Sequence, residues 1–165
     1  MRKWIVSAFL LALCCFPAAA QDHPKFELFG GYQFTHLESS FNGSGWNASG
    51  TGNFNNWFGV TADFSGAYQN GVHSHAFLFG PVLSYRKSDR LTPFVHVLFG
   101  DTHVTVSGVP GSTDGFTTAL GGGFDTKLAN HVSWRIVQAD WMLTHFSGDT
   151  QGKNARVSTG LIFRF

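Results

Sequence analysis

The chain has 165 residues, of which 43% are apolar, 16% are aromatic and only 13% are charged, and it contains twenty glycines. This composition is too apolar for a disordered chain, and the length suits a single domain. Beyond the first twenty residues, nine basic residues stand against ten acidic ones, which argues against a nucleic-acid partner held through its phosphates.

The first twenty residues have the three regions of a secretory signal peptide. Arg2 and Lys3 form a basic start, an apolar stretch runs from Trp4 to Phe16, and small residues end at Ala20. A membrane-spanning helix needs about 20 apolar residues, and this stretch is shorter. We therefore expect residues 1–20 to be a cleaved signal peptide and residues 21–165 to form the folded domain.

Removal of this segment leaves a chain with few means of stabilising an aqueous core. Both cysteines, Cys14 and Cys15, lie inside the signal, so no disulfide is expected in the mature domain. The apolar fraction of residues 21–165 falls to about 38%, which is low for a packed core of this size.

The mature chain alternates between apolar and polar residues with a period of two, which is typical of β-strands with one polar face. Its frequent glycines argue against long helices. The predicted strands cover residues 26–36, 46–54, 58–65, 76–86, 92–103, 116–127, 137–144 and 156–165. Arg135 falls out of phase with Gln138 and Asp140. Either a bulge between them, or an arginine at the membrane edge with its head in water, would explain this position.

The connections between the predicted strands alternate in length. Short turns are expected near residues 55–56, 87–91 and 128–131. Longer loops rich in Gly, Ser, Asn and Asp are expected over residues 37–45, 66–74, 104–115 and 146–155. Short turns at one rim and long loops at the other are typical of an outer-membrane barrel, whose strands cross in about 9 to 11 residues.

These features predict an all-β fold, a closed eight-stranded antiparallel up-and-down transmembrane barrel. In hydrocarbon every backbone polar group needs a partner within the protein, so a sheet can span only when it closes on itself. The apolar faces would then contact lipid, and the polar faces would line the lumen. The charged residues expected in the lumen are Glu27, Asp63, Arg86, Asp125, Asp140, Arg156 and Arg164.

Closure of the barrel predicts one specific ion pair. Glu27 lies near the start of the first strand and Arg164 near the end of the last, and these strands meet at the short-turn rim. We expect their charged atoms to lie within about 8 Å, roughly one Debye length. An eight-stranded interior is only wide enough for side chains to fill, so a wide pore is not expected.

The last strand carries a family resemblance. Residues 157–165, Val-Ser-Thr-Gly-Leu-Ile-Phe-Arg-Phe, resemble the C-terminal signal of bacterial outer-membrane proteins. The stretches 27–32, 79–81 and 121–128 are similar to the small eight-stranded barrels related to the membrane domain of outer-membrane protein A and to the opacity-type porins. The likeness covers the whole mature chain.

This resemblance implies a location, partners and a set of functional residues. It implies a bacterial outer-membrane protein of the cell envelope, surrounded by outer-membrane lipids and recognised by the barrel-assembly machinery. The residues of the implied assembly signal are Val157, Thr159, Leu161, Phe163 and Phe165. The same residues are expected to coat the lipid-facing surface.

No motif in the chain predicts an enzyme, a metal site or a cofactor. His73 and His75 would lie on one side of an extended segment, but no cysteine or nearby carboxylate completes a tetrahedral set. We therefore expect a hydrated loop there. No G-x-S-x-G motif joins the serines, histidines and aspartates into a hydrolase, although barrels with a Ser/His pair at the lipid boundary exist.

The leading hypothesis is a non-enzymatic integral outer-membrane barrel that holds four loops at the cell surface, with a structural or surface-interaction role. A lipid-modifying enzyme of the same fold, a narrow porin-like channel and a soluble eight-stranded carrier remain as alternatives. The ligand of the loops is not indicated by the sequence.

Overall fold

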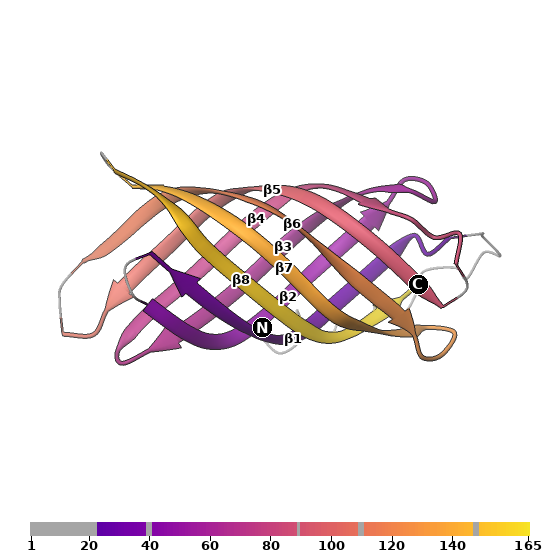
Figure 1. The fold of residues 1–165 in the computed structure, drawn as a ribbon, viewed down its shortest axis with the longest axis horizontal. Helices are drawn as coiled ribbons and strands as arrows, with labels where there is room; N and C mark the ends of the chain where they lie inside the picture. The colour runs from indigo at the N-terminus through magenta and orange to yellow at the C-terminus, as the bar shows by residue number, and fades with distance from the viewer. Residues whose placement is uncertain (1–22, 39–40, 89, 109–110, 147–148) are drawn as a thin grey trace, which may run out of the picture.

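The computed structural model describes residues 23–38, 41–88, 90–108, 111–146 and 149–165. The predicted signal peptide lies outside these residues. Eight strands make up the fold, and they run obliquely around a single closed wall (Figure 1). Their bounds are β1 Phe26–Leu37, β2 Phe41–Asn53, β3 Phe58–Gln69, β4 Val72–Ser84, β5 Leu91–Val106, β6 Ser112–Lys127, β7 Val132–Phe146 and β8 Asp149–Arg164.

Each strand pairs antiparallel with the next one along the chain, and β8 returns to β1, with Glu27 opposite Arg164 and His36 opposite Ala155. The predicted closed up-and-down barrel is therefore confirmed. Closure leaves no sheet edge, so the backbone groups of the wall are satisfied within the protein. None of the described residues forms a helix long and apolar enough to cross a membrane.

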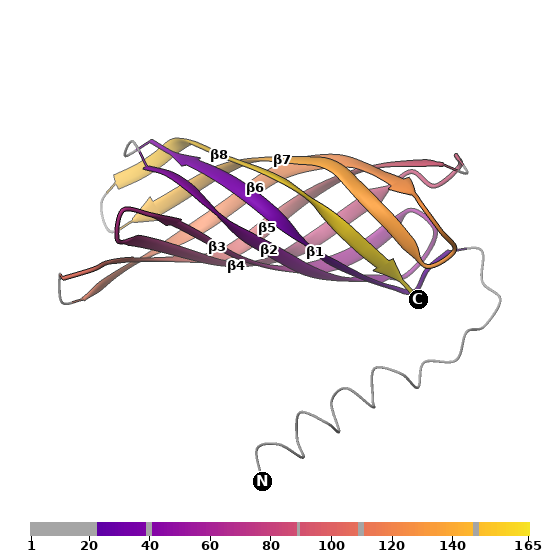
Figure 2. The ribbon, with the colours of Figure 1, turned by 90° about the horizontal axis from the view of Figure 1, so that it is seen from below.

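The two ends of the barrel differ in how the strands are joined. At one end lie the predicted short connections, residues 54–57, 85–90 and 128–131. The C-terminus lies at this same end (Figure 2), where the Phe165 amide donates a hydrogen bond to the carbonyl of Phe26 (2.8 Å). We call this the turn end and the opposite one the hairpin end.

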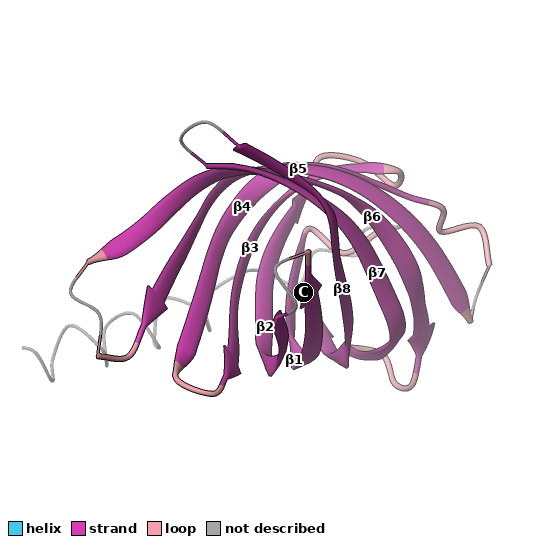
Figure 3. Ribbon diagram, turned by 60° about the vertical axis from the view of Figure 1, so that its left-hand side comes forward, coloured by secondary structure: helices cyan, strands magenta, loops and turns pink. Residues whose placement is uncertain are grey.

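The prediction of long loops at the hairpin end is wrong, because the strands continue through most of those residues. Only Asn70 and Gly71 separate β3 from β4, and β5, β6 and β8 each have 16 residues. At about 3.3 Å per residue and a tilt near 45°, such strands exceed a hydrocarbon layer roughly 25 Å thick. The polar composition of these residues indicated loops. Strands that extend into water as hairpins have the same composition, and Figure 3 shows the strands continuing almost to the connections.

The distribution of polar and apolar side chains in the barrel is the reverse of that in a water-soluble protein. Among the described residues, twenty-three polar or charged residues are buried against only eleven apolar ones, and large aromatic and aliphatic side chains are exposed. The lumen also holds a small apolar layer that includes Leu78, Leu98 and Met142, all less than 4% exposed. Apolar residues thus coat the outside and fill part of the middle.

The out-of-phase arginine is explained by a bulge. The pairing of β7 with β8 shifts between Arg135 and Gln138, and the pairing of β6 with β7 shifts between Phe124 and Asp125. The extra residue returns Arg135 to the inside, where its side chain is 10% exposed. Of the two explanations offered by the sequence, the bulge applies.

Candidate functional site

The lumen is built around Arg156 on β8, whose side chain crosses between three strands. Its Nε donates to Asp140 on β7 (2.7 Å), and its Nη1 donates to Asp63 on β3 (2.6 Å) and to the Ser65 hydroxyl (3.1 Å). Arg156 is 1% exposed and the two carboxylates are 2–3% exposed. An arginine has the planar, five-donor head that such a three-way arrangement requires.

A histidine that sequence reasoning did not single out completes this central group. His96 Nε2 on β5 lies 2.8 Å from Asp140 Oδ1, and the Gln138 amide donates to Asp140 Oδ2 (2.8 Å). The alternation of β5 places His96 on the polar face, but it does not reveal which carboxylate lies opposite. The carboxylate of Asp140 therefore contacts three side chains from three strands, β5, β7 and β8.

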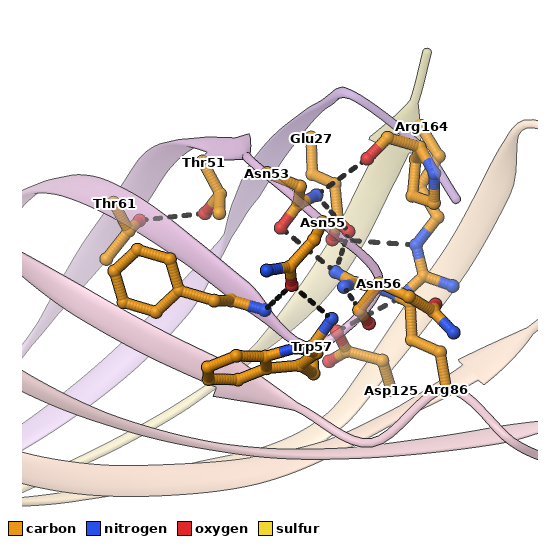
Figure 4. A network of polar contacts seen from close by, with 12 residues as sticks. Glu27, Thr51, Asn53, Asn55, Asn56, Trp57, Thr61, Arg86, Asp125 and Arg164 are labelled. Atoms are coloured by element: carbon orange, nitrogen blue, oxygen red, sulfur yellow. Dashed lines mark hydrogen bonds and ion pairs between the residues drawn. The ribbon is translucent and has the colours of Figure 1, made fainter. Parts of the chain in front are cut away.

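A second polar network closes the turn end of the lumen (Figure 4). Glu27 pairs with Arg86 and also with Arg164, whose Nε lies 3.5 Å from Glu27 Oε2. The predicted pair between Glu27 and Arg164 therefore forms. Asn53 donates to Glu27 Oε1 (3.0 Å) and accepts from Arg86 (3.2 Å), so β1, β2, β8 and the start of the β4–β5 turn are joined.

Arg135 connects the turn-end network to the wall of the barrel. Its Nε donates to Asp125 Oδ1 (2.9 Å), and Asp125 also lies 3.4 Å from Arg164. The guanidinium carbon lies 4.5 Å from the ring centroid of Phe29 and 4.2 Å from that of Phe94. Two buried rings thus face the same cation, an arrangement that favours a desolvated guanidinium.

The described lumen carries a balanced set of charges. Its four carboxylates and four guanidinium groups belong to Glu27, Asp63, Asp125, Asp140, Arg86, Arg135, Arg156 and Arg164. The set contains all seven residues that the sequence placed in the lumen, together with Arg135. Two small cavities of about 20 Å³ each lie among the described lumen residues, so side chains fill most of the space there.

The residues of the implied assembly signal lie on the outer surface of β8 and at the chain end. Val157, Leu161, Phe163 and Phe165 are between 44% and 53% exposed. Thr159 is half-buried, because its hydroxyl donates to the carbonyl of Arg135 (2.9 Å) and accepts from the indole of Trp134 (3.2 Å). The row therefore lies on the outer surface of the barrel, apart from the half-buried Thr159.

The histidine pair is not in a loop, contrary to the sequence-based expectation. His73 and His75 lie on β4 with their side chains outside the lumen, and the Tyr68 hydroxyl lies 3.1 Å from His75 Nε2. The Trp46 indole donates to the same hydroxyl (3.1 Å). Within the described residues, no group of three or more His, Cys, Asp or Glu side chains could hold a metal ion.

Comparison with known proteins gives one family and several barrels of the same shape. The family model of the outer membrane protein beta-barrel domain matches residues 6–165. No curated protein matches the chain in sequence.

Three solved structures show how far the likeness of fold extends. Neisserial surface protein A is 9% identical, with a TM-score of 0.65, and the match covers 88% of this chain and 100% of that one. The N-terminal barrel of OprF from Pseudomonas aeruginosa is 11% identical (TM-score 0.60; 87% and 100% covered). The attachment invasion locus protein Ail of Yersinia pestis is 16% identical (TM-score 0.54; 87% and 99% covered).

Proposed function

Because the chain belongs to the outer membrane protein beta-barrel family, as the match over residues 6–165 establishes, we propose that it is a non-enzymatic barrel that holds four hairpin ends at the bacterial cell surface. The observation that carries this proposal is the contrast between the two parts of the molecule. The lumen is filled by balanced ion pairs, whereas the strands extend beyond the hydrocarbon at one end.

The hairpin end supports a surface-interaction role because it presents ordered polar and aromatic groups outside the barrel. Tyr68 joins Trp46 to His75 through its hydroxyl, and His103 pairs with Asp114 across β5 and β6. His145 lies 2.7 Å from the Thr150 hydroxyl. Side chains held by such contacts lose less conformational entropy on binding a partner than free ones do.

The proposal includes the route by which the chain reaches this location. Residues 1–20 act as a cleaved signal peptide, so the mature chain begins near Gln21. The alternating outward residues of β8, ending in Phe165, then bind the barrel-assembly machinery. Outer-membrane lipids surround the folded barrel and contact its aromatic exterior.

The test is fractionation of cells that express the full chain. We expect the protein in the outer-membrane fraction, with an intact mass that corresponds to cleavage before Gln21 and a gel mobility that changes on heating. Deletion of Phe165 should reduce the folded, heat-modifiable form. Recovery of the protein in the soluble periplasmic fraction would contradict the proposal, and unchanged assembly without Phe165 would refute the terminal signal.

A deletion strain separates this function from an enzymatic one. If the barrel is not an enzyme, the acyl chains of lipopolysaccharide and phospholipids keep the same masses in the presence and absence of the gene. A lost or a new acyl chain would instead indicate a lipid-modifying enzyme.

A further inference from the structure

The outer surface of the barrel has a large apolar recess near the turn end. Its volume is about 610 Å³, and its lining spans β4 to β7 and includes Tyr85, Pro93, Val95, Phe124 and Ala139. This volume lies within the range of small-molecule sites, roughly 300–1,000 Å³. It is about thirty times larger than either cavity in the lumen.

The recess exists because two outward positions of adjacent strands carry almost no side chain. Gly122 on β6 is the register partner of Ala139 on β7 and of Val95 on β5. Larger exposed side chains also line the recess, among them Tyr85 (57% exposed) and Phe124 (46% exposed). A Cβ at position 122 would lie 2.4 Å from the carbonyl oxygen of Phe94, so glycine is required there.

Shape alone does not select a ligand in a membrane, because lipid tails are as apolar as the side chains that they contact. An acyl chain that lies in the recess gains packing contacts with the protein, but it gains no free energy of transfer out of water. Any preference for one lipid must therefore come from polar groups at the edge of the recess.

Cations stand at the turn-end edge of the recess. Lys87 follows Tyr85 by two residues, and its Nζ lies 5.9 Å from the centroid of the Tyr85 ring. Arg90 lies in the same connection, and its carbonyl accepts a hydrogen bond from the Lys127 amide (2.9 Å). All three side chains are exposed, and none pairs with a carboxylate among the described residues.

The charge at this edge is therefore positive. With Asp89 of the same connection counted from the sequence, the three cations leave a net charge of +2. At the hairpin end the exposed acids have basic partners, since Glu38 pairs with Lys153 and Asp114 pairs with His103. Exposed cations next to a membrane surface attract anionic lipid headgroups.

We propose that this recess and its cationic edge bind one anionic phospholipid. The phosphate and glycerol headgroup lies against Lys87, with Arg90 and Lys127 nearby, and one acyl chain lies on the floor formed by Gly122 and Ala139. The inference goes beyond the proposed surface role and rests on the barrel being embedded in a bilayer with its turn end at one leaflet.

Trp57 offers a direct reporter, because it lines the recess and is 60% exposed. The mature protein with Trp46, Trp134 and Trp141 changed to phenylalanine keeps Trp57 alone. It is refolded in phosphatidylcholine vesicles that contain a small mole fraction of phosphatidylglycerol with brominated acyl chains, which quench tryptophan on contact. The matched reporter keeps Trp134 alone, which does not line the recess and whose indole donates to the Thr159 hydroxyl on β8 (3.2 Å).

We expect the quenching of Trp57 to exceed the level that the bulk mole fraction of brominated lipid gives, which indicates enrichment around it. The quenching of Trp134 should match the bulk mole fraction. Lys87→Gln should reduce the apparent affinity about fivefold, the effect of one cation near a membrane surface. Lys25→Gln, at the same end but beside β1, is the charge control and should change nothing. Ala139→Phe should fill the floor and reduce the enrichment at Trp57. Ala48→Phe adds the same bulk to the outer face of β2 and should leave the enrichment unchanged.

Three outcomes would overturn the proposal. If the quenching of Trp57 equals the level that the bulk mole fraction of brominated lipid gives, no lipid is selected. Equal enrichment of brominated phosphatidylcholine would remove the role of the cations. If the protein forms a dimer and Ala139→Phe dissociates it, the recess would be assigned to a second copy of the chain. Because these measurements use vesicles, they remain informative even if cell fractionation contradicts the surface role.

Discussion

At the scale of single residues, the lumen depends on Arg156. Its guanidinium is the partner of both Asp63 and Asp140, and all three groups are almost completely buried. A buried ion pair gains little over a well-packed apolar pair, but removal of one partner leaves an uncompensated charge. The loss of Arg156 would remove the guanidinium partner of both Asp63 and Asp140.

We therefore predict that Arg156→Leu destabilises the barrel by about 3–5 kcal/mol, the usual result of breaking a buried pair. The measurement is the free energy of unfolding from urea titration in lipid vesicles, followed by tryptophan fluorescence. Lys153→Leu is the control, because the pair of Lys153 with Glu38 is 3.6 Å long and the lysine side chain is 84% exposed. Its effect should stay below about 1 kcal/mol, and similar losses for both variants would contradict the central role of Arg156.

Glu38 joins two hairpins at the opposite end of the molecule. Its Oε2 accepts from the backbone amides of Lys153 (3.2 Å) and Gly152 (3.1 Å). These hydrogen bonds hold the pKa of the Glu38 carboxyl below its ordinary value of 4.5. A lowered pKa in the folded state means that the contact stabilises fully above the ordinary value and is lost as the pH falls through the lowered one.

We predict that amide exchange at Gly152 and Lys153, corrected for intrinsic rate, stays slow above pH 4.5 and becomes faster as the pH falls below it. In the Glu38→Gln variant these two amides should exchange fast even at neutral pH, since a neutral amide oxygen is a weaker acceptor than a carboxylate. Protection that is equal in both proteins at neutral pH would rule out this contact as the cause.

At the scale of elements, the hairpins show what sequence patterns reveal and what they miss. Alternation predicted all eight strands and their inward faces, because burial on one side only requires a period of two. It did not predict that β3 and β4 continue to Asn70 and Gly71, since polar strands in water and polar loops have the same composition. The signal that remained was the Asn-Gly pair, which favours a two-residue hairpin.

The lumen was predictable as a set but not as a network. Each charged residue lies on a polar face that alternation identifies, and barrel closure predicted that Glu27 meets Arg164. The contacts from Arg156 to Asp63 and from His96 to Asp140 join strands far apart in the chain. They depend on the stagger of strands around the barrel, which a single sequence does not specify.

The hairpin between β3 and β4 depends on backbone conformation. Asn70 and Gly71 have φ of 46° and 80°, the left-handed region that favours glycine. We predict that Gly71→Ala destabilises the barrel by about 1–2 kcal/mol. Gly52→Ala is the control, because φ is not positive there and a Cβ would meet nothing within 4 Å. Equal unfolding free energies in the two variants would show that the turn conformation is not limiting.

At the scale of the whole molecule, the barrel separates a structural interior from an adaptable exterior. The interior is neutral in charge and nearly full, so it holds the wall in one register and one shape. The exterior differs along its length, with apolar side chains over the strands, exposed cations at the turn end and acids paired with His103 and Lys153 at the hairpin end. Functional variation is therefore expected on the outside.

The filled lumen predicts that the barrel does not conduct ions as a porin does. A cavity of about 20 Å³ has room for roughly one water molecule, whereas an open pore needs a continuous water-filled path. We expect the mature protein in planar bilayers to give no regular conductance steps. A variant with Arg156, Asp63 and Asp140 all changed to alanine removes the central side chains without leaving a lone charge among them.

That variant should conduct if the Arg156 group is the barrier, provided that its heat-modifiable mobility shows a folded barrel. Regular steps from the unchanged protein would show instead that the network opens under an applied potential. Silence in both proteins would move the barrier to the turn end, where Glu27, Arg86 and Arg164 form the second layer of ion pairs. Conductance of the variant alone and silence of both proteins thus each locate the point at which the lumen is closed.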